Sequence, residues 1–454
     1  MKLEKIYAHT DLVRNNQESL DDNFQRSTRK DGWLAALFVG SLIFGPEVIV
    51  NPAFPPFRFA DVVILFLLFT RGLKSRFFYG GFIFSYRIRA FNFLLLALTF
   101  TVSVSIAFNV LSGRNPFFYK DLFFPIVFLR MILIATIAST FNFQAWQIRQ
   151  FALGILLIGT ISATLAFAQR AGFLGYGSII ETLYLRSSHL ERQEAFEVTA
   201  RRVVGTFGNP NVFGGCLTML AAMTLPFAIN RTGIVRYMSI VVFLALSGAI
   251  LMTTGSRTAL IGLFIAVSLA LLLSLRRGSR LIGLLFVILF AIAVVFIRAN
   301  IYALPVSQRL QDIITGRGLT TAESFLARIQ MWKFSLALAK ESLLFGIGAT
   351  KTWRQLTDNG YVFMLLRAGI IGLSIYILWL LWMLISGLTA LRLEHDLSKR
   401  ALLLALIVVL GNHAVFEITG EFFWNIQYSA LFIAFMGMLC GFSKQIMFEH
   451  RQDE

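Results

Sequence analysis

The chain has 454 residues, of which 57% are hydrophobic and 14% are charged. Soluble domains carry about 25% charged residues, so this composition excludes an ordinary soluble protein and predicts an integral membrane protein in a lipid bilayer. The formal net charge of +17 does not indicate a nucleic-acid partner, because the cytoplasmic loops of membrane proteins collect Lys and Arg.

Long apolar runs separated by short polar turns follow one another along the chain. A helix that crosses a hydrocarbon core about 30 Å thick needs about 20 apolar residues, and it satisfies its own backbone hydrogen bonds. We therefore predict an all-α polytopic membrane protein with about 12 transmembrane helices. The predicted spans are residues 32–50, 59–73, 90–111, 118–140, 148–172, 212–228, 234–252, a span between 258 and 276, 281–297, 361–388, 401–418 and 424–442.

Basic residues gather in alternate turns, and the positive-inside rule assigns those turns to the cytoplasm. Both termini are then cytoplasmic: residues 1–31 and 443–454 form tails around a single membrane domain, residues 32–442. The two long polar loops, residues 173–211 and 298–360, lie on the outer side. The basic residues that decide this topology are Arg71, Lys74, Arg76, Arg87, Arg89, Arg231, Arg236, Arg276, Arg277, Arg280, Arg392, Lys399 and Arg400.

The first outer loop ends in Arg-Arg-Val-Val-Gly-Thr-Phe-Gly-Asn-Pro-Asn, residues 201–211, directly before a predicted span. Its glycines, proline and asparagines predict a turn that caps the start of a helix, where backbone N–H groups favour an anion. Arg201, Arg202, Asn209 and Asn211 are therefore candidate binding residues. The alternative is a capped loop with two exposed arginines.

Arg257 follows the span 234–252 in the turn Thr-Thr-Gly-Ser-Arg-Thr. The topology places it with Arg202 on the outer surface. Planar guanidinium groups hold phosphate groups bidentately, so two arginines from different loops would form a clamp for a diphosphate. The alternative is an arginine that extends to the lipid headgroups.

The second outer loop contains a predicted amphipathic helix over residues 325–340, which we expect in the outer membrane interface. Arg328 on this helix is a candidate contact for an anionic ligand, with a headgroup-facing arginine as the alternative. The predicted apolar face of the helix consists of Phe325, Ile329, Trp332 and Leu336.

Asp358 and Asn359 close the second outer loop, directly before the span 361–388. A carboxylate at this position either caps the following helix or faces the arginines. In the second case Asp358 would orient or deprotonate an attacking hydroxyl group.

Titratable residues also occur within or beside the predicted spans. His413, Glu417 and Glu421 recur at intervals of four, which places them on one face of a helix; they either line a cavity or pair with arginines. Arg130 lies well inside the span 118–140, where a charge is either functional or part of an internal ion pair.

Several catalytic patterns are missing from the sequence. It contains no P-loop, no His/Cys metal spacing, no Gly-x-Ser-x-Gly and no Asp-x-Asp, so we expect no metal and no cofactor. A transporter or flippase for lipid-linked sugars is the competing class of protein, but it predicts internal repeats and broken helices at the bilayer midplane. The sequence halves show no such repeat.

Five motifs occur in a characteristic order: Arg-x-x-Gly-Thr-Phe-Gly-Asn-Pro-Asn (202–211), Gly-Ser-Arg (255–257), Arg-x-x-x-Trp (328–332), Gly-Ile-Gly (346–348), and Asp-Asn-Gly-Tyr followed by Gly-Ile-Ile-Gly (358–372). In this order and membrane placement the chain resembles the O-antigen ligase and O-antigen polymerase superfamily over about residues 155–385. Members of this superfamily are bacterial polytopic enzymes that act on polyprenyl-diphosphate-linked glycans.

The resemblance implies a metal-independent, inverting glycosyltransferase of the membrane C type at the outer face of the bacterial inner membrane. A glycan on undecaprenyl diphosphate would pass to an acceptor hydroxyl, with a chain-length regulator and a flippase as candidate partners. Arg202 and Arg257 would hold the diphosphate. The candidate substrate-binding residues are Arg201, Asn209, Asn211, Arg328, Asn359, His413 and Glu417.

Members of the ligase branch usually carry a His-Asn pair where this chain has Asp358-Asn359. This departure favours the polymerase branch, in which the acceptor is another lipid-linked repeat unit of an O-antigen or exopolysaccharide. Asp358 is then the candidate acceptor-side residue, and transfer of the glycan to another acceptor, as in a ligase, is the alternative.

Overall fold

A computed structural model describes residues 31–45, 47–48, 57–74, 88–114, 119–173, 203–207, 209–230, 233–274, 323–348 and 359–453. This part of the chain is helical apart from a two-residue antiparallel ladder, in which β1 (Glu47–Val48) pairs with β2 (Phe57–Arg58). Within these described ranges, seven helices are long and apolar enough to span a membrane, and four shorter helices are also apolar. The predicted fold class, an all-α polytopic membrane protein, is confirmed.

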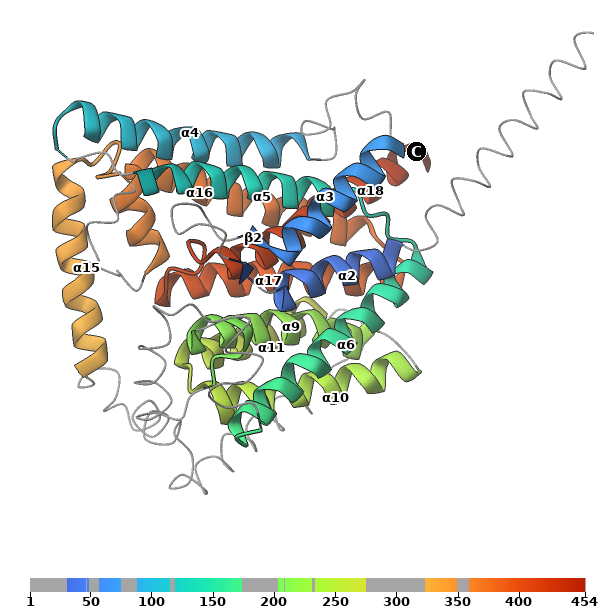
Figure 1. Ribbon diagram of the computed structural model, residues 1–454. Coiled ribbons are helices and arrows are strands. Elements are labelled where there is room, and N and C mark those ends of the chain that lie inside the picture. The colour runs from blue at the N-terminus through green and yellow to red at the C-terminus, as the bar shows by residue number, and fades with distance from the viewer. Residues whose placement is uncertain are drawn as a thin grey trace, which may run out of the picture.

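Each predicted span except residues 281–297, which lie outside the described residues, coincides with one apolar helix. Most of these helices run roughly parallel or antiparallel to one another, from side to side in the view of Figure 1. They are α2 (Asp31–Phe44), α3 (Phe59–Lys74), α4 (Arg89–Leu111), α5 (Phe123–Ser139), α6 (Ala145–Arg170), α9 (Pro210–Asn230), α10 (Ile234–Ala249), α11 (Arg257–Ser274), α16 (Gly360–Leu393), α17 (Leu397–Thr419) and α18 (Ile426–Asp453).

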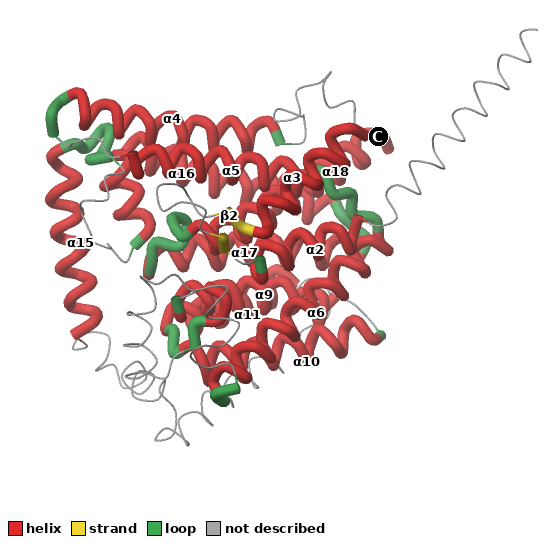
Figure 2. Tube along the Cα trace, in the orientation of Figure 1, coloured by secondary structure: helices red, strands yellow, loops and turns green. Residues whose placement is uncertain are grey.

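The alternation of the helices defines two ends of the bundle, and the loops lie at these ends (Figure 2). At the first end, here called the α15 end, α9, α11, α16 and α18 begin and α6 and α17 finish. At the opposite end α6, α10 and α17 begin and α18 finishes. The assignment of the opposite end to the cytoplasm stays a prediction from the basic residues. Residues 443–453, predicted as a tail, continue α18.

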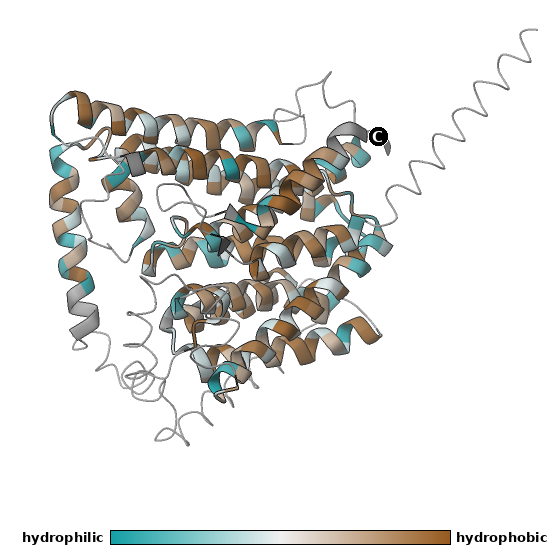
Figure 3. Cartoon of the chain, in the orientation of Figure 1, coloured by the Kyte–Doolittle hydropathy of each residue, from teal (hydrophilic) through white to brown (hydrophobic). Residues whose placement is uncertain are grey.

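Helix α9 is the most deeply buried of the membrane-span candidates among the described residues, followed by α17 and α18, which are buried to the same extent. Every residue in the apolar window of α9 is buried, whereas α4, α10 and α16 bury less than half of theirs. Helix α17 packs against α9, α11, α16 and α18. The outer helices are nevertheless coloured as hydrophobic over much of their length as well (Figure 3), because in a membrane both the core and the lipid-facing surface are apolar.

The first predicted span extends beyond the helix that the structure shows. Helix α2 ends at Phe44, whereas the apolar pattern predicted a span to residue 50. Gly45 and Pro46 follow Phe44 in the sequence, and proline lacks the N–H that a continuing helix needs.

The charge at Arg130 is part of an internal ion pair. Arg130 Nε on α5 lies 2.7 Å from Asp61 Oδ1 on α3, and the other carboxylate oxygen of Asp61 accepts a hydrogen bond from the backbone N–H of Arg58 at 2.8 Å. Asp61 thereby connects the β ladder, α3 and α5. Of the two interpretations of Arg130, the structure supports the ion pair.

A helix predicted in the second outer loop is present as α15 (Glu323–Glu341), and it lies across the ends of α4 and α16 (Figure 1). The face of this helix that packs against the protein is not the predicted apolar face, whose placement in the membrane interface stays a prediction. Ser335 and Ala339 are buried, whereas the Leu336 side chain is 40% exposed. The face that packs is therefore set by contact with α16, near Leu366, and not by the largest apolar side chains.

The segment after α15 docks into a break in α16. Gly369 interrupts the helix with φ 68° and ψ −170°, which frees backbone groups for contacts outside the helix. Ile347 N–H donates to Leu366 O at 2.8 Å, and Ile370 N–H donates to Leu343 O at 2.8 Å. Asn109 Nδ2 on α4 donates to Gly346 O at 2.9 Å. These bonds fix α15, α4 and the first turns of α16 relative to one another.

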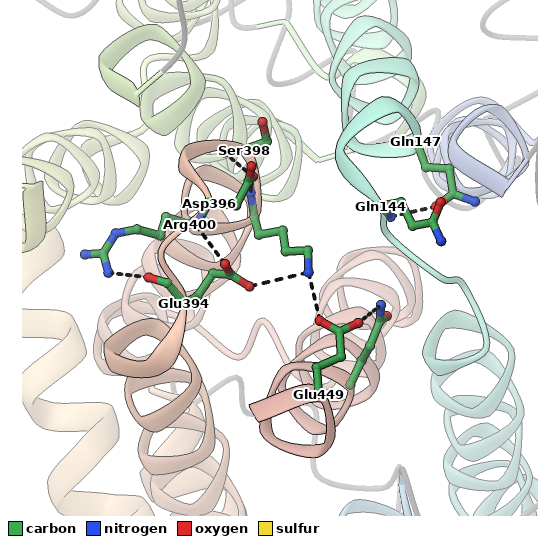
Figure 4. A network of polar contacts seen from close by, with 9 residues as sticks. Gln144, Gln147, Glu394, Asp396, Ser398, Arg400 and Glu449 are labelled. Carbon is green, nitrogen blue, oxygen red and sulfur yellow. Dashed lines mark hydrogen bonds and ion pairs between the residues drawn. The ribbon is translucent and has the colours of Figure 1, made fainter. Parts of the chain in front are cut away.

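At the opposite end, polar side chains bind one another (Figure 4). Lys399 Nζ lies 2.8 Å from Glu449 Oε2 and 3.7 Å from Glu394 Oε2. Asp396 Oδ1 caps α17 by accepting from the N–H groups of Ser398 and Lys399 at 2.8 and 2.9 Å. Helices α16, α17 and α18 are thus joined by a closed polar network.

Candidate functional site

The Gly-Ser-Arg motif forms a tight turn between α10 and α11. Helix α10 widens into the π-helical segment η4 (Ile250–Thr254), and Gly255 follows with φ 58°, a left-handed conformation that glycine adopts without the strain of a Cβ. Ser256 Oγ then accepts from the Ala259 N–H at 3.3 Å and caps α11. Arg257 is therefore the first residue of α11; its side chain lies outside the described part of the chain.

The segment that leads into α9 lies directly beside this turn. Val203, the residue after Arg202, donates its backbone N–H to Thr253 O at 2.9 Å, four residues before Arg257 along the chain. The two chain segments that carry the predicted arginine clamp therefore meet at the α15 end. Arg201 and Arg202 themselves lie outside the described residues.

The predicted cap at the start of α9 is confirmed. Asn209 Oδ1 accepts from the N–H groups of Asn211 at 2.8 Å and Val212 at 3.3 Å, and Pro210 is the first residue of the helix. Proline suits this position because its missing N–H is one that no helical carbonyl would have accepted. The motif thus starts a helix, as its residue types indicate.

A pocket of about 240 Å³ opens at the α15 end between these helix starts. The first turns of α9 and α11 form one part of its wall, and the connection between α17 and α18 forms the other. Asn425 Oδ1 caps α18 there by accepting from the N–H groups of Gln427 at 3.2 Å and Tyr428 at 3.0 Å. The pocket is lined by Asn209, Asn211, Val212, Thr258, Thr419, Gly420, Glu421, Phe422, Trp424 and Asn425.

Three helix starts at the pocket favour an anion, whereas the Glu421 carboxylate in the lining opposes one. The N-termini of α9, α11 and α18 meet at it, and each helix start carries a partial positive charge of about half an elementary charge. Their caps, Asn209, Ser256 and Asn425, are neutral, so no capping carboxylate cancels that charge. Thr258 lines the pocket and follows Arg257 directly in the chain. The described residues hold no cluster of three His, Cys, Asp or Glu side chains fit for a metal.

Asn359, predicted beside Asp358, caps α16. Its Oδ1 accepts from the Val362 N–H at 3.0 Å, and its Nδ2 donates to Ile418 O at 3.0 Å. The cap of this helix is thus Asn359, not Asp358, which the capping alternative had assigned. Asp358 lies outside the described residues, directly before this cap in the sequence.

His413 and Glu417 are fully buried in α17 and do not line the pocket. His413 Nε2 lies 2.7 Å from the Tyr376 hydroxyl, and Glu417 Oε1 accepts from the Phe423 N–H at 2.7 Å. Glu421, predicted on the same helical face, lies beyond the end of α17 at Thr419 and lines the pocket. The regular spacing of four therefore does not place all three residues at one site.

The structure also shows a charge that sequence reasoning did not single out. Arg367 on α16 is 4% exposed, donates from Nη1 to Gly348 O at 3.1 Å and interacts electrostatically with Glu421 and Asp121. The sequence does show an arginine inside the apolar run 361–388. A charged side chain within a span costs free energy and is therefore a candidate functional residue. Arg328, by contrast, is half-buried on α15 and is not part of the pocket wall.

Together these observations define a polytopic membrane protein with an anion-suited pocket at one end of its helical bundle. Residues 240–377 match a family model described as O-antigen ligase, which confirms the resemblance to the O-antigen ligase and polymerase superfamily drawn from the motifs. The match covers less than half of the chain and includes η4, α11, α15 and the first part of α16. A search of curated proteins found no match.

Proposed function

We propose that this protein transfers a glycan from undecaprenyl diphosphate to an acceptor hydroxyl group, and that it polymerises lipid-linked oligosaccharide repeat units into an O-antigen or exopolysaccharide. The observation that carries the proposal is the meeting of three helix N-termini at a pocket whose wall continues from Arg257 into Thr258. A diphosphate is the part of the donor that such a pocket suits, because helix starts and guanidinium groups both bind phosphate oxygens.

The reaction needs stabilisation of the leaving group more than a strong nucleophile. The acceptor oxygen bonds to the anomeric carbon of the donor from the face opposite the diphosphate, and the bond from that carbon to the diphosphate oxygen breaks. The electron pair stays on the lipid diphosphate, whose added charge Arg202, Arg257 and the helix starts neutralise. Fixed positive groups in a poorly hydrated site are the largest single source of such stabilisation.

The hydrogen bond from Val203 to Thr253 supports the pairing of Arg202 with Arg257. It holds the residue next to Arg202 against the segment that leads to Arg257, so both arginines are attached to the same small region of backbone. Arg201, Asn209 and Asn211 belong to the same region, and we assign them to the binding of the diphosphate or of the first sugar.

The other predicted substrate-binding residues receive supporting roles in the proposal. Asn359 fixes the start of α16 through its two hydrogen bonds, and His413 and Glu417 hold the wall of the pocket from behind. Arg328 on α15 is assigned to the approach of the lipid headgroup, since it lies outside the pocket wall.

Asp358, directly before the cap of α16, is the residue we assign to orienting the acceptor hydroxyl. Its presence in place of the histidine of the ligase branch favours the polymerase reaction. Transfer of the whole glycan to a different acceptor remains the second candidate, because the same donor site serves both reactions. We place the α15 end at the outer face of the inner membrane, where a flippase delivers donors and a chain-length regulator acts.

Replacing Arg257 with Ala in cells and separating the surface glycans on a gel tests the function. Loss of long chains with single repeats retained supports the polymerase, and loss of all glycan attachment supports the ligase. Accumulation of donors on the inner leaflet supports a flippase instead. Arg392→Ala is the matched control, because Arg392 is exposed in the last turn of α16 at the opposite end. An unchanged glycan pattern in Arg257→Ala would contradict the proposal.

A further inference from the structure

Glu421 is the one ionisable side chain among the pocket-lining residues that the structure describes. The remaining lining is neutral, and it includes the first turns of helices whose positive ends favour an anion. A carboxylate in such a wall repels the diphosphate. Its place in the pocket therefore indicates a task in the reaction other than binding the leaving group.

The loop that carries Glu421 is short and anchored. Helix α17 ends at Thr419, two residues before Glu421. After Glu421, the Phe423 N–H donates to Glu417 Oε1 at 2.7 Å, and the N–H of Asn425, which caps α18, donates to Phe422 O at 3.0 Å. These bonds connect the backbone that follows Glu421 to α17 and to the start of α18. A group on a fixed loop keeps the geometry that proton transfer requires.

The charges around Glu421 come from two helices behind the wall. Arg367 on α16 interacts with it electrostatically, and so does Glu417 on α17. Arg257 begins α11 next to Thr258 on the facing wall. Glu421 is thus a carboxylate on an anchored loop that lines the pocket, which suits it to accept a proton during a reaction.

We infer that Glu421 is the catalytic base that takes the proton from the acceptor hydroxyl, and this inference rests on the proposed glycan transfer. As the acceptor oxygen bonds to the anomeric carbon, its proton moves to the Glu421 carboxylate, and the bond from that carbon to the diphosphate breaks with its electron pair retained by the lipid diphosphate. Asp358 orients the acceptor, while Glu421 removes its proton. The glutamate returns the proton to water after product release.

The test uses the full-length protein purified in detergent, with lipid-linked repeat units extracted from the host cells as substrate. Glu421→Gln keeps the size of the side chain and removes its basicity. We expect its kcat to fall by about 10²-fold or more, the range for loss of a general base, while its affinity for undecaprenyl diphosphate stays within about threefold of the original. Glu449→Gln, in the network at the opposite end, is the matched control with unchanged activity.

Glu421→Asp is the second variant, and it keeps the charge but moves it by about one methylene. We expect an intermediate kcat, because a displaced base transfers protons less well, with unchanged binding of undecaprenyl diphosphate. If Glu421→Gln does not fold, the kcat of Glu421→Asp tests whether Glu421 is the catalytic base. A kcat within about threefold of the original for either folded variant overturns the role of Glu421.

Arg257→Ala, measured in the same assay, separates this inference from the proposed function. If Arg257→Ala loses transfer while Glu421→Gln retains it, the glycan-transfer function stands and the base is another residue. If Arg257→Ala transfers glycan as well as the original protein, the diphosphate site itself is wrong. Loss of undecaprenyl diphosphate binding in Glu421→Gln would assign the glutamate to binding and also overturn its role as a base.

Discussion

The α15 end and the opposite end of the bundle both contain capped helix starts and charged side chains, but they use them differently. At the opposite end the cap of α17 is Asp396, whose negative charge lies at the positive start of the helix, and Lys399 is paired with Glu449 and Glu394. At the α15 end the caps of α9, α11 and α18 are neutral side chains. Their helix dipoles remain available to a ligand.

This difference shows how the same capping rule serves stability at one end and, in the function proposed above, binding at the other. An aspartate and an asparagine cap a helix about equally well, but only the aspartate cancels the positive charge of the helix start. A pocket for a diphosphate therefore requires caps that satisfy the backbone without adding negative charge. The choice of asparagine or serine at three converging helix starts meets this requirement.

The largest expected loss of stability comes from Gly346, in the segment that connects α15 to the break in α16. At Gly346, with φ 70°, a Cβ would lie 2.6 Å from backbone atoms of Arg367 and Gly369. Gly346→Ala combines left-handed strain with overpacking, and we expect it to destabilise the protein by about 3 kcal/mol. Thermal unfolding in detergent measures this. Gly113→Ala is the control, because Gly113 has a similar φ of 68° but no atom lies within 4 Å of the added Cβ. If Gly113→Ala lost as much stability as Gly346→Ala, the contact between α15 and α16 would not explain the effect.

The second prediction tests whether Glu417 supports the pocket wall. A Cβ at Gly360, the first residue of α16, would overlap Glu417 Oε2, and Glu417 is fully buried. We expect Gly360→Ala to cost about 2 kcal/mol and to lower transfer activity, as measured by unfolding and by the glycan assay. Gly248→Ala on α10, where the nearest contact is an ordinary 3.6 Å, should cause neither change. Full activity in Gly360→Ala would show that the start of α16 does not affect glycan transfer at the site.

A third prediction exchanges the caps of the two ends. Asn209→Asp keeps the cap of α9 but adds a negative charge beside the pocket, so we expect the affinity for undecaprenyl diphosphate to fall by about tenfold with little loss of stability. Asp396→Asn, the reverse change at the opposite end, should leave binding unchanged. Isothermal titration or a filter-binding assay gives both affinities. Equal effects at the two ends would show that the pocket does not use the start of α9.

The smallest effect is expected from the polar network at the opposite end. Lys399→Ala removes contacts to Glu449 and Glu394, whose side chains are 43% and 10% exposed. Exposed ion pairs contribute about 0.2–1 kcal/mol, so we expect a loss of stability below about 1 kcal/mol and no change in glycan transfer. A large loss of transfer in this variant would mean that the opposite end takes part in the reaction.

The local pattern of the sequence predicted much of the architecture and part of the site. Apolar runs located the helices, and the turn residues around Asn209 located the cap of α9. These features depend on neighbours within a few positions along the chain, so periodicity and residue type are sufficient for them. The same reasoning found the family motifs, but it left open whether Glu421 lines a cavity or pairs with arginines, and it did not single out Arg367. Spacing along one helix does not show where that helix ends or what faces it.

The sequence by itself determined that this is a membrane protein with alternating helices and capped helix starts, since hydrophobicity and capping are local properties. Only the tertiary structure decided that the starts of α9, α11 and α18 meet at one pocket, that Glu421 enters it and that His413 and Glu417 are buried behind it. The physical reason is that a pocket is formed by helix ends far apart in the sequence, and their meeting depends on packing between helices, not on the order of residues within any one of them.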